Sequence, residues 1–480
     1  MTKKKGFLQN SIWGLASNIL QNILLSVFFV IIARNFSKED FGNYIIANSL
    51  YQVISSFSAL GLGQWFIRQL NEESDLSHFL NKFLKIQIFA GLFFYAINIA
   101  VTFALYNDDT LKILSLLIGI NIVFDNIIYS VKHLNIAQFE QNKTFVVLII
   151  EAVIKLGLGL VIFIYPYTIV EMAVALVIIR VITLNLFLRI STSKLASLKS
   201  IIKNKVNFID FKSLIIANWP FIIIGSISVI YWRIGSILIS KFLSAASVAT
   251  YEVAYKLFSL AEIIPVIISA TIFPELLRAY KGEGTESFNN LYKLFYKIYL
   301  VFGFLAFSFI YSFADDLVLL AFGKNFADAG FYTKGMFLTI LIFPTALLQA
   351  NVLIILKMEK KDMWFNISSF AVNFILSFVG LMYFKSLTTI NLSIFASFVV
   401  FHLLQDMVMV KQKIATPLSI FTSYLILFAC WAAYVIGSDY VNHYFLFIGF
   451  WTIAFSIIIL TDHRIKGFIQ EKIGLNIKQV

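Results

Sequence analysis

Four basic residues of this 480-residue chain lie well inside long apolar stretches, where a charge is costly: Lys155, Arg180, Arg233 and Lys256. A charge at the centre of a bilayer costs roughly 3 kcal/mol on insertion scales, so such residues face a cavity, pair with an acid or extend to the headgroups. Ammonium and guanidinium groups bind phosphate oxygens, and the planar arginine fork does so through two parallel hydrogen bonds. The residue types therefore predict a cationic cavity that binds an anionic group within the membrane.

Two of these four residues follow a glutamate by four positions, Lys155 after Glu151 and Lys256 after Glu252. Side chains at this spacing share a helix face, so each pair can form a salt bridge that only neutralises the lysine. The alternative is that the lysine faces the cavity and the glutamate tunes it. Both interpretations stay open for Lys155, whereas the salt bridge is favoured for Lys256.

The two arginines have no such acidic neighbour. Arg180 has no acid within one helical turn, so its partner must come from another helix or from a ligand. Arg233 lies about 9 Å from the outer end of its stretch, within reach of the headgroups. Asp125 is an isolated intramembrane acid, which could be a proton or cation site or the counter-charge of Arg180. Asp406 and Glu262 lie closer to the cytoplasmic side and are interpreted as structural, so Arg180 and then Arg233 are the main candidates for anion binding.

The elements that position these residues are predicted to be about fourteen membrane-spanning helices. Sixty per cent of the residues are hydrophobic and only 13% are charged, as in a polytopic all-α membrane protein. About twenty residues of helix cross roughly 30 Å of hydrocarbon, where backbone groups must be paired within the segment. We expect spans at 12–33, 42–66, 86–106, 111–131, 144–166, 168–188, 214–239, 247–273, 294–314, 331–356, 363–384, 388–410, 418–437 and 444–461.

The remaining basic residues predict the orientation of these spans. Three of the 38 lysines and arginines, Lys112, Lys297 and Lys334, lie within the first four residues of a span and are counted with the gap before it. On that count, 27 lie in the two tails and the even-numbered gaps and only 7 in the odd-numbered gaps. The positive-inside rule then places both termini in the cytoplasm, which fits a multi-pass protein of the bacterial inner membrane. The net charge of +12 is concentrated in these short loops, where it orients spans and meets anionic lipid, so a nucleic-acid partner is not expected.

An enzymatic function is not predicted. Gly-rich phosphate loops, CxxC pairs, HExxH and GxSxG motifs are absent, so neither a cofactor nor a metal site is expected. A membrane glycan polymerase would be expected to carry a long outside loop with catalytic residues. The longest outside gap, 315–330, is too short for that.

The chain contains an internal repeat. Residues 34–50 and 241–257 align without a gap, with Ser37 matching Ser244 and Tyr44 matching Tyr251. Both stretches join the first two spans of a six-span set, and both sets begin in the same orientation. Parallel repeats of this kind are typical of transporters whose substrate path lies between the halves. We therefore expect three parts: an N-lobe of spans 1–6 (1–193), a C-lobe of spans 7–12 (194–413), and spans 13–14 with a cytoplasmic tail (414–480).

Three prolines within the predicted spans are candidate hinges, because each removes a helix hydrogen bond. They are Pro220 in span 7, Pro265 in span 8 and Pro344 in span 10.

Two regions of the chain carry a family resemblance. NSIWGLASNILQNILLSVFFVIIARNFSKEDFGNYIIANSL (10–50) resembles the start of a Wzx-type polysaccharide flippase of the multidrug/oligosaccharidyl-lipid/polysaccharide (MOP) superfamily. YEVAYKLFSLAEIIPVIISATIFPELLRAY (251–280) resembles the matching region of the second half. Family members often carry an acid directly after the basic residue of span 7. Here Ile234 and Gly235 follow Arg233, which puts ion coupling through that position in doubt.

The resemblance implies two six-helix lobes in a V around a cationic cavity. It also implies transport of undecaprenyl-pyrophosphate-linked oligosaccharide, such as an O-antigen or capsule repeat unit, to the outer leaflet by alternating access. The partners would be this lipid-linked oligosaccharide, membrane lipids and glycan-assembly proteins. Within the superfamily, a peptidoglycan-precursor flippase or a cation-coupled multidrug exporter remain alternatives. A drug exporter would need an acid-rich cavity, whereas basic residues prevail here.

Overall fold

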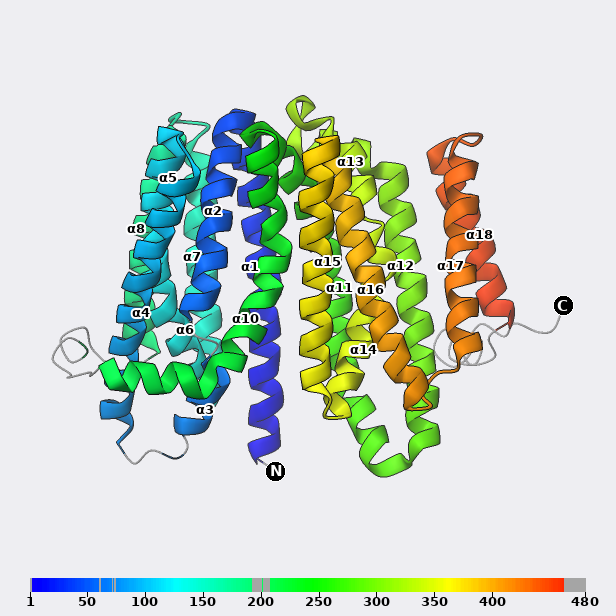
Figure 1. Ribbon diagram of the computed structural model, residues 1–480, viewed down its shortest axis with the longest axis horizontal. Coiled ribbons are helices and arrows are strands. Elements are labelled where there is room, and N and C mark those ends of the chain that lie inside the picture. The colour runs from blue at the N-terminus through cyan, green and yellow to red at the C-terminus, as the bar shows by residue number, and fades with distance from the viewer. Residues whose placement is uncertain are drawn as a thin grey trace.

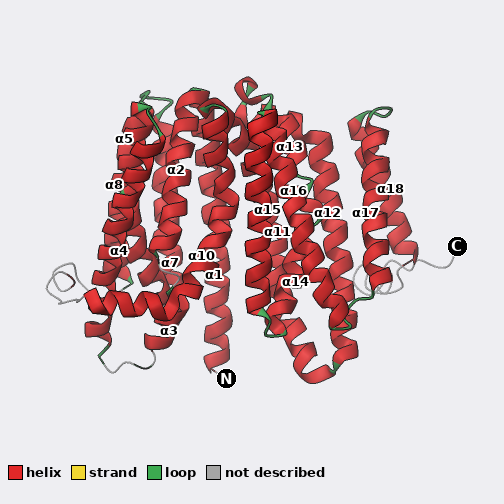
Figure 2. Cartoon of the chain, in the orientation of Figure 1, coloured by secondary structure: helices red, strands yellow, loops and turns green. Residues whose placement is uncertain are grey.

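The computed structural model describes residues 2–59, 62–70, 72, 75–191, 201 and 208–461, and in these residues the chain is almost entirely helical and has no strand (Figures 1 and 2). Three single turns, η1 (Ala279–Glu283), η2 (Lys324–Phe326) and η3 (Thr339–Leu341), join longer helices. The helices are α1 Thr2–Asn35, α2 Lys38–Ser58, α3 Gly63–Leu70, α4 Leu76–Leu105, α5 Asp109–Gly119, α6 Asn121–Ala137, α7 Gln141–Val161, α8 Ile169–Ile190, α10 Phe208–Phe242, α11 Ala245–Arg278, α12 Thr285–Phe322, α13 Ala329–Met336, α14 Phe343–Ile355, α15 Glu359–Phe384, α16 Leu387–Lys411, α17 Pro417–Ser438 and α18 His443–Thr461.

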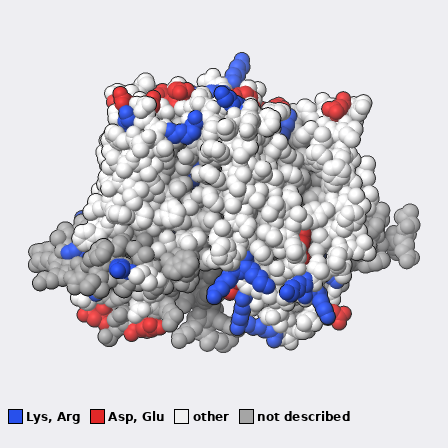
Figure 3. All heavy atoms as spheres, in the orientation of Figure 1, with Lys and Arg blue, Asp and Glu red and all other residues white. Residues whose placement is uncertain are grey.

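The predicted all-α membrane fold is confirmed. Eleven helical segments of the described residues are long and apolar enough to cross a bilayer. The other three predicted spans correspond to α2, α10 and α18, which run beside them in the same layer (Figure 1). On the face drawn in Figure 3, charged side chains gather at the two ends of the molecule, and the band between them shows very few. We call the end that carries residues 36–37, 106–108 and 323–328 the outer end, following the predicted orientation, and the opposite end the inner end.

The fourth span of each half is broken, which the sequence did not predict. The first is divided at Ile120 into α5 and α6, and the second consists of α13, η3 and α14. Helix α12 lies close to the backbone of the second break: a Cβ added at Gly303 of α12 would lie only 2.7 Å from the carbonyl oxygen of Ile340. Each broken span ends at the inner end in a residue with positive φ, Phe139 at 59° and Lys357 at 58°. The two halves therefore share a structural device as well as a sequence pattern.

The predicted repeat also has the same local structure in both halves. Ser37 caps α2 by accepting a hydrogen bond from the Asp40 backbone N–H, and Ser244 caps α11 by accepting one from Ser247. An N-cap serine satisfies a backbone donor that the first turn would leave free. The matched serines thus begin the second helix of each set.

The spans form two six-span lobes, with α17 and α18 at one edge beside α12 (Figure 1). The lobes meet along α2, which packs against α10 and α11. The predicted boundary at 193/194 lies outside the described residues, as does the tail after 461. The second predicted boundary, at 413/414, falls in the turn between α16 and α17.

The lobes are in direct contact at the outer end. Lys38 Nζ lies 2.8 Å from Asp328 Oδ1 and 3.3 Å from Thr250 Oγ1, which joins the start of α2 to the second lobe. Gly42 lies so close to α11 that a Cβ there would overlap the carbonyl oxygen of Ala245. The structure is therefore closed at the outer end.

We expect Gly42→Ala to keep the lobes apart at the outer end, because the added methyl group meets rigid backbone. Closure can be measured by joining cysteines placed at Lys38 and Asp328 with a short bifunctional reagent, after Cys430→Ser removes the native thiol. Gly157→Ala is the matched control, since a Cβ at that helical position meets nothing within 4 Å. Equal cross-linking in the two variants would contradict the tight seam.

Candidate functional site

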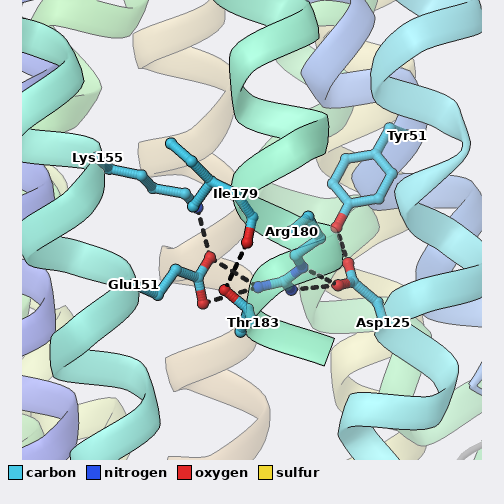
Figure 4. Close-up of polar contacts among 7 residues, drawn as sticks. All are labelled: Tyr51, Asp125, Glu151, Lys155, Ile179, Arg180 and Thr183. Atoms are coloured by element: carbon cyan, nitrogen blue, oxygen red, sulfur yellow. Dashed lines mark hydrogen bonds and ion pairs between the residues drawn. The ribbon is translucent and has the colours of Figure 1, made fainter. Parts of the chain in front are cut away.

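Arg180 on α8 is the centre of a buried ion-pair network in the first lobe (Figure 4). Its Nη1 donates to both carboxylate oxygens of Glu151 on α7, at 2.8 and 3.0 Å. Its Nε donates to Asp125 Oδ1 on α6 at 2.6 Å, and Nη2 donates to the same oxygen. The arginine fork therefore joins two helices through two acids. Of the roles predicted for Asp125, the structure bears out the counter-charge of Arg180.

Two further side chains complete this network. Lys155 Nζ lies 2.6 Å from Glu151 Oε1, so the salt bridge within the helix, one of the two interpretations left open for Lys155, is present. The Tyr51 hydroxyl on α2 donates to Asp125 Oδ2 (Figure 4). The Glu151 side chain is 1% exposed, which is tolerable for a carboxylate in a membrane only because two cations neutralise it.

Arg233 on α10 forms a second network at the seam between the lobes. Its Nη1 donates to Glu252 Oε1 on α11 and its Nε donates to Gln52 Oε1 on α2, both at 2.8 Å. Its guanidinium also lies over the Tyr255 ring, at 5.1 Å from the centroid. Arg233 is thus bound inside the protein, which excludes the alternative that it extends to the headgroups.

The predicted salt bridge between Lys256 and Glu252 is also wrong. Glu252 pairs with Arg233 instead, because the guanidinium from the neighbouring helix reaches its carboxylate. Lys256 has no carboxylate within ion-pair distance among the described residues, and its Nζ lies 5.5 Å from the centre of the Phe29 ring on α1. Lys256, for which the sequence favoured a salt bridge, is therefore available, whereas Arg180 and Arg233, which have no acidic neighbour in the sequence, are paired.

Lys132 is a functional candidate that the sequence reasoning missed. It was assigned to a cytoplasmic gap, but α6 continues to Ala137 and places it two turns after Asp125 on the same helix. It is half-buried, interacts electrostatically with Arg180, Asp125 and Glu151, and forms no ion pair within 4.0 Å among the described residues. Its spacing of seven residues from Asp125 was the signal that could have identified it.

Helix α2 lies between the two networks and contacts both of them. Tyr51 binds Asp125 of the first network, and the adjacent Gln52 binds Arg233 of the second. Consecutive residues of a helix point about 100° apart, so one helix can hold two clusters on different sides. Movement of α2 relative to α10 would therefore change the partners of Arg233.

The candidate hinges are placed differently from one another. Pro265 lies inside α11, together with Pro274. Pro220 lies in α10, which runs along the inner end before it turns toward the outer end (Figure 1). Pro344 is in the first turn of α14, where no helix hydrogen bond is lost, so it starts a helix and does not kink one. Hinge motion at Pro220 and Pro265 stays a prediction.

Groups of three or more His, Cys, Asp or Glu side chains that could hold a metal ion do not occur among the described residues.

Comparisons with known proteins agree with this architecture. No curated protein matches the sequence. Among solved structures, the lipid II flippase MurJ in an inward closed conformation has a TM-score of 0.66 at 16% identity, over 98% of this chain and 100% of that chain. An inward-facing multidrug resistance MATE family transporter of the MOP superfamily also has a TM-score of 0.66, at 10% identity, over 84% and 99% of the two chains. A MOP superfamily transporter from Pyrococcus furiosus, described as having a binding pocket of reverse polarity, has a TM-score of 0.54 at 13% identity, over 84% and 95%.

These likenesses show a shared fold. The family model of polysaccharide biosynthesis proteins matches residues 7–280, which is more than half of the chain. The chain belongs to the polysaccharide biosynthesis protein family, and its fold is that of MOP superfamily transporters.

Proposed function

We propose that this multi-pass membrane protein is a flippase of the bacterial inner membrane. Its cargo is an oligosaccharide repeat unit linked to undecaprenyl pyrophosphate, which it moves from the cytoplasmic to the outer leaflet by alternating access. The glycan passes between the lobes while the lipid tail stays in the bilayer, so no covalent step is needed. Membership of the polysaccharide biosynthesis family and the fold of MOP superfamily transporters support this cargo and route. Glycan-assembly proteins would act before and after it.

The single observation that carries the proposal is the pair of available lysines beside the two ion-pair networks. Lys132 and Lys256 lack a carboxylate within ion-pair distance among the described residues, so an incoming diphosphate can bind them without displacing an acid. Arg180 and Arg233 lie next to them but are held by Asp125, Glu151 and Glu252. In the proposal the arginine networks position the lysines, and the lysines bind the diphosphate first.

The same networks make a multidrug exporter the weaker alternative. An organic cation needs an accessible carboxylate, and Asp125, Glu151 and Glu252 are each bound to an arginine. A peptidoglycan-precursor flippase stays the stronger alternative, because the MurJ structure shares the fold and its cargo is named lipid II. Cells that lack this protein distinguish the two: loss of surface polysaccharide with normal cell-wall synthesis supports the proposal.

Replacing Lys132 or Lys256 with glutamine should lower surface polysaccharide roughly 10- to 100-fold, the effect of losing one hydrogen bond to a charged group. The amount of protein in the membrane should not change, because neither lysine neutralises a buried acid. Lys112→Gln is the matched control, since Lys112 lies at the outer end beside Asp109. Normal polysaccharide in the double variant Lys132→Gln/Lys256→Gln would refute the role of these lysines.

A further inference from the structure

Two amide side chains of the first membrane span are exposed. Asn18 and Asn22 lie one turn apart on α1, within the apolar segment Trp13–Asn35, and Asn22 is near its centre. Asn126, an amide within another span, is buried and donates hydrogen bonds to α2. Asn185 is exposed but lies in the last two turns of α8 at the inner end, where the headgroups are within reach. An unpaired amide in hydrocarbon is costly, so the pair on α1 requires polar surroundings.

Helix α1 has a second exposed face, and that face is apolar. Leu20, Ile23 and Val27 are exposed and recur at the spacing of one helix face. At 100° per residue, this apolar stripe lies roughly 150° around the helix from Asn18 and Asn22. The stripe has the chemistry of a surface that faces lipid tails, whereas the amide face does not. The two exposed faces of α1 therefore have different surroundings.

The amide face of α1 is also the face that meets the second lobe at the outer end. Phe29 follows Asn22 by two turns on this face. The centre of its ring lies 5.5 Å from Lys256 Nζ on α11 and 6.1 Å from the ring centre of Phe322 on α12. The second lobe thus covers the outer half of the face and leaves Asn18 and Asn22 exposed in the inner half. Because α1 is at the edge of the first lobe beside the second (Figure 1), these amides face the space between the lobes.

We propose that Asn18 and Asn22 form a sugar-binding surface on the wall of the transport path, which binds the oligosaccharide of the cargo. Its place in transport rests on the proposed function, whereas the binding of sugar does not. A primary amide carries both donors and an acceptor, so it can bind the hydroxyl groups of a sugar without a charge. Two side chains one turn apart on a helix lie roughly 6 Å from each other, so both amides can bind the same short stretch of glycan.

The position of the amides relative to Lys256 fits a division of the cargo between the two lobes. Asn22 lies about 10 Å along α1 from Phe29, whose ring is next to Lys256. A diphosphate bound at Lys256 would therefore place the sugars attached to it close to the amide face. Residues 13–33 contain no charged side chain, so this part of α1 does not compete with the lysines for the diphosphate. The amide face thus contributes to the choice of glycan, and the lysines to the binding of the anion.

Access of water to the amide face is tested by cysteine labelling of the full-length protein in inverted membrane vesicles, after Cys430→Ser removes the native thiol. Asn22→Cys should react with a membrane-impermeant maleimide added from the cytoplasmic side. Ile23→Cys is the matched control, because it lies at the same depth on the apolar stripe and should not react. Equal labelling of the two cysteines would overturn the placement of the amide face on the transport path.

Sugar binding is tested by equilibrium dialysis of the purified protein with oligosaccharide released by mild acid from the cell's own lipid-linked pool. The wild-type protein should bind this lipid-free probe, and Asn18→Leu/Asn22→Leu should bind it roughly 10-fold more weakly, since each neutral hydrogen bond contributes about 2- to 10-fold. Leu20→Ala/Ile23→Ala is the matched control on the apolar stripe and should bind as the wild type does. No binding by the wild type, or equal binding by the leucine variant, would overturn the sugar surface.

Transport in vesicles separates this inference from the proposed function. The wild type should move polyprenyl pyrophosphate faster when it carries the oligosaccharide than when it carries no sugar. The variant Asn18→Leu/Asn22→Leu should move the two lipids at the same rate, and a preference that survives in this variant would overturn the role of the amides. If the wild type moves neither lipid, the proposed function fails, and the dialysis measurement still decides whether the sugar surface exists.

Discussion

Arg180→Gln should abolish surface polysaccharide and also lower the amount of folded protein. Removing this guanidinium leaves Asp125 without its ion pair and leaves Glu151 with Lys155 alone. Breaking a buried pair by removing one partner costs roughly 3–5 kcal/mol, a large part of the stability of a typical domain. Membrane-extracted protein, assayed for thermal aggregation and for amount per cell, measures this loss.

Two further variants separate the structural role of Arg180 from its role in transport. Arg180→Lys keeps the positive charge, but an ammonium group cannot bind both acids as the planar guanidinium does. We therefore expect an amount of folded protein between those of the wild type and Arg180→Gln, and poor transport. The neutralised variant Arg180→Gln/Asp125→Asn/Glu151→Gln should recover protein amount without recovering surface polysaccharide. Normal polysaccharide in Arg180→Gln would show that the network is dispensable.

Arg233→Gln should have the second-largest effect, because it breaks the contact between the lobes as well as an ion pair. Glu252 is 6% exposed and would be left without its arginine, again at roughly 3–5 kcal/mol. Arg278→Gln is the matched control, since its exposed pair with Glu275 is worth at most about 1 kcal/mol.

The cross-lobe contact can be isolated through Gln52. Gln52→Leu removes the acceptor from α2 but leaves Arg233 bound to Glu252. We expect normal protein amount and reduced transport, and a double-mutant cycle with Arg233→Gln should be non-additive because the two side chains are in contact. Additive effects on transport would show that α2 and α10 do not act together through this pair.

The contacts of α2 suggest how cargo binding and lobe movement are connected. Its start is held at the outer end through Lys38, and its middle binds one network through Tyr51 and the other through Gln52. If the lobes separate at the outer end, the Lys38 and Gln52 contacts of α2 must break, together with the bonds from Tyr106 to Ser240 and from Lys241 to the Leu105 carbonyl. Arg233 would then lose its partner on α2 and keep Glu252.

Much of the fold could be predicted from sequence, because membrane spans follow directly from apolar length and loop charge. The repeat that matches Ser37 to Ser244 was also visible in the sequence. The spans that follow these serines were predicted to begin at 42 and 247, whereas the helices begin at Lys38 and Ala245, directly after the serine caps. The breaks at Ile120 and around Thr339–Leu341 could not be predicted, because both lie within unbroken apolar sequence. The second span was also predicted to end at residue 66, whereas α2 ends at Ser58.

The candidate site was predicted in part. Spacing of four residues correctly joined Lys155 to Glu151, but the same rule failed for Lys256 because an arginine on another helix competes for Glu252. Local spacing shows which side chains share a helix face, but only the packing of the helices shows which cation pairs with a given carboxylate. Lys132 was missed because a helix can extend past the apolar stretch that reveals it.

In the proposed function, Lys132 and Lys256 bind the diphosphate of the lipid-linked cargo that the protein moves. The most direct measurement is a vesicle assay with purified protein, in which polyprenyl-pyrophosphate-linked oligosaccharide is followed as it becomes accessible on the opposite leaflet. The wild-type protein should accelerate this movement, and should do so less for the same glycan on a neutral lipid. The Lys132→Gln/Lys256→Gln variant should show neither the acceleration nor this preference. Equal movement of the diphosphate-linked and neutral substrates, or full activity of the double variant, would contradict the account.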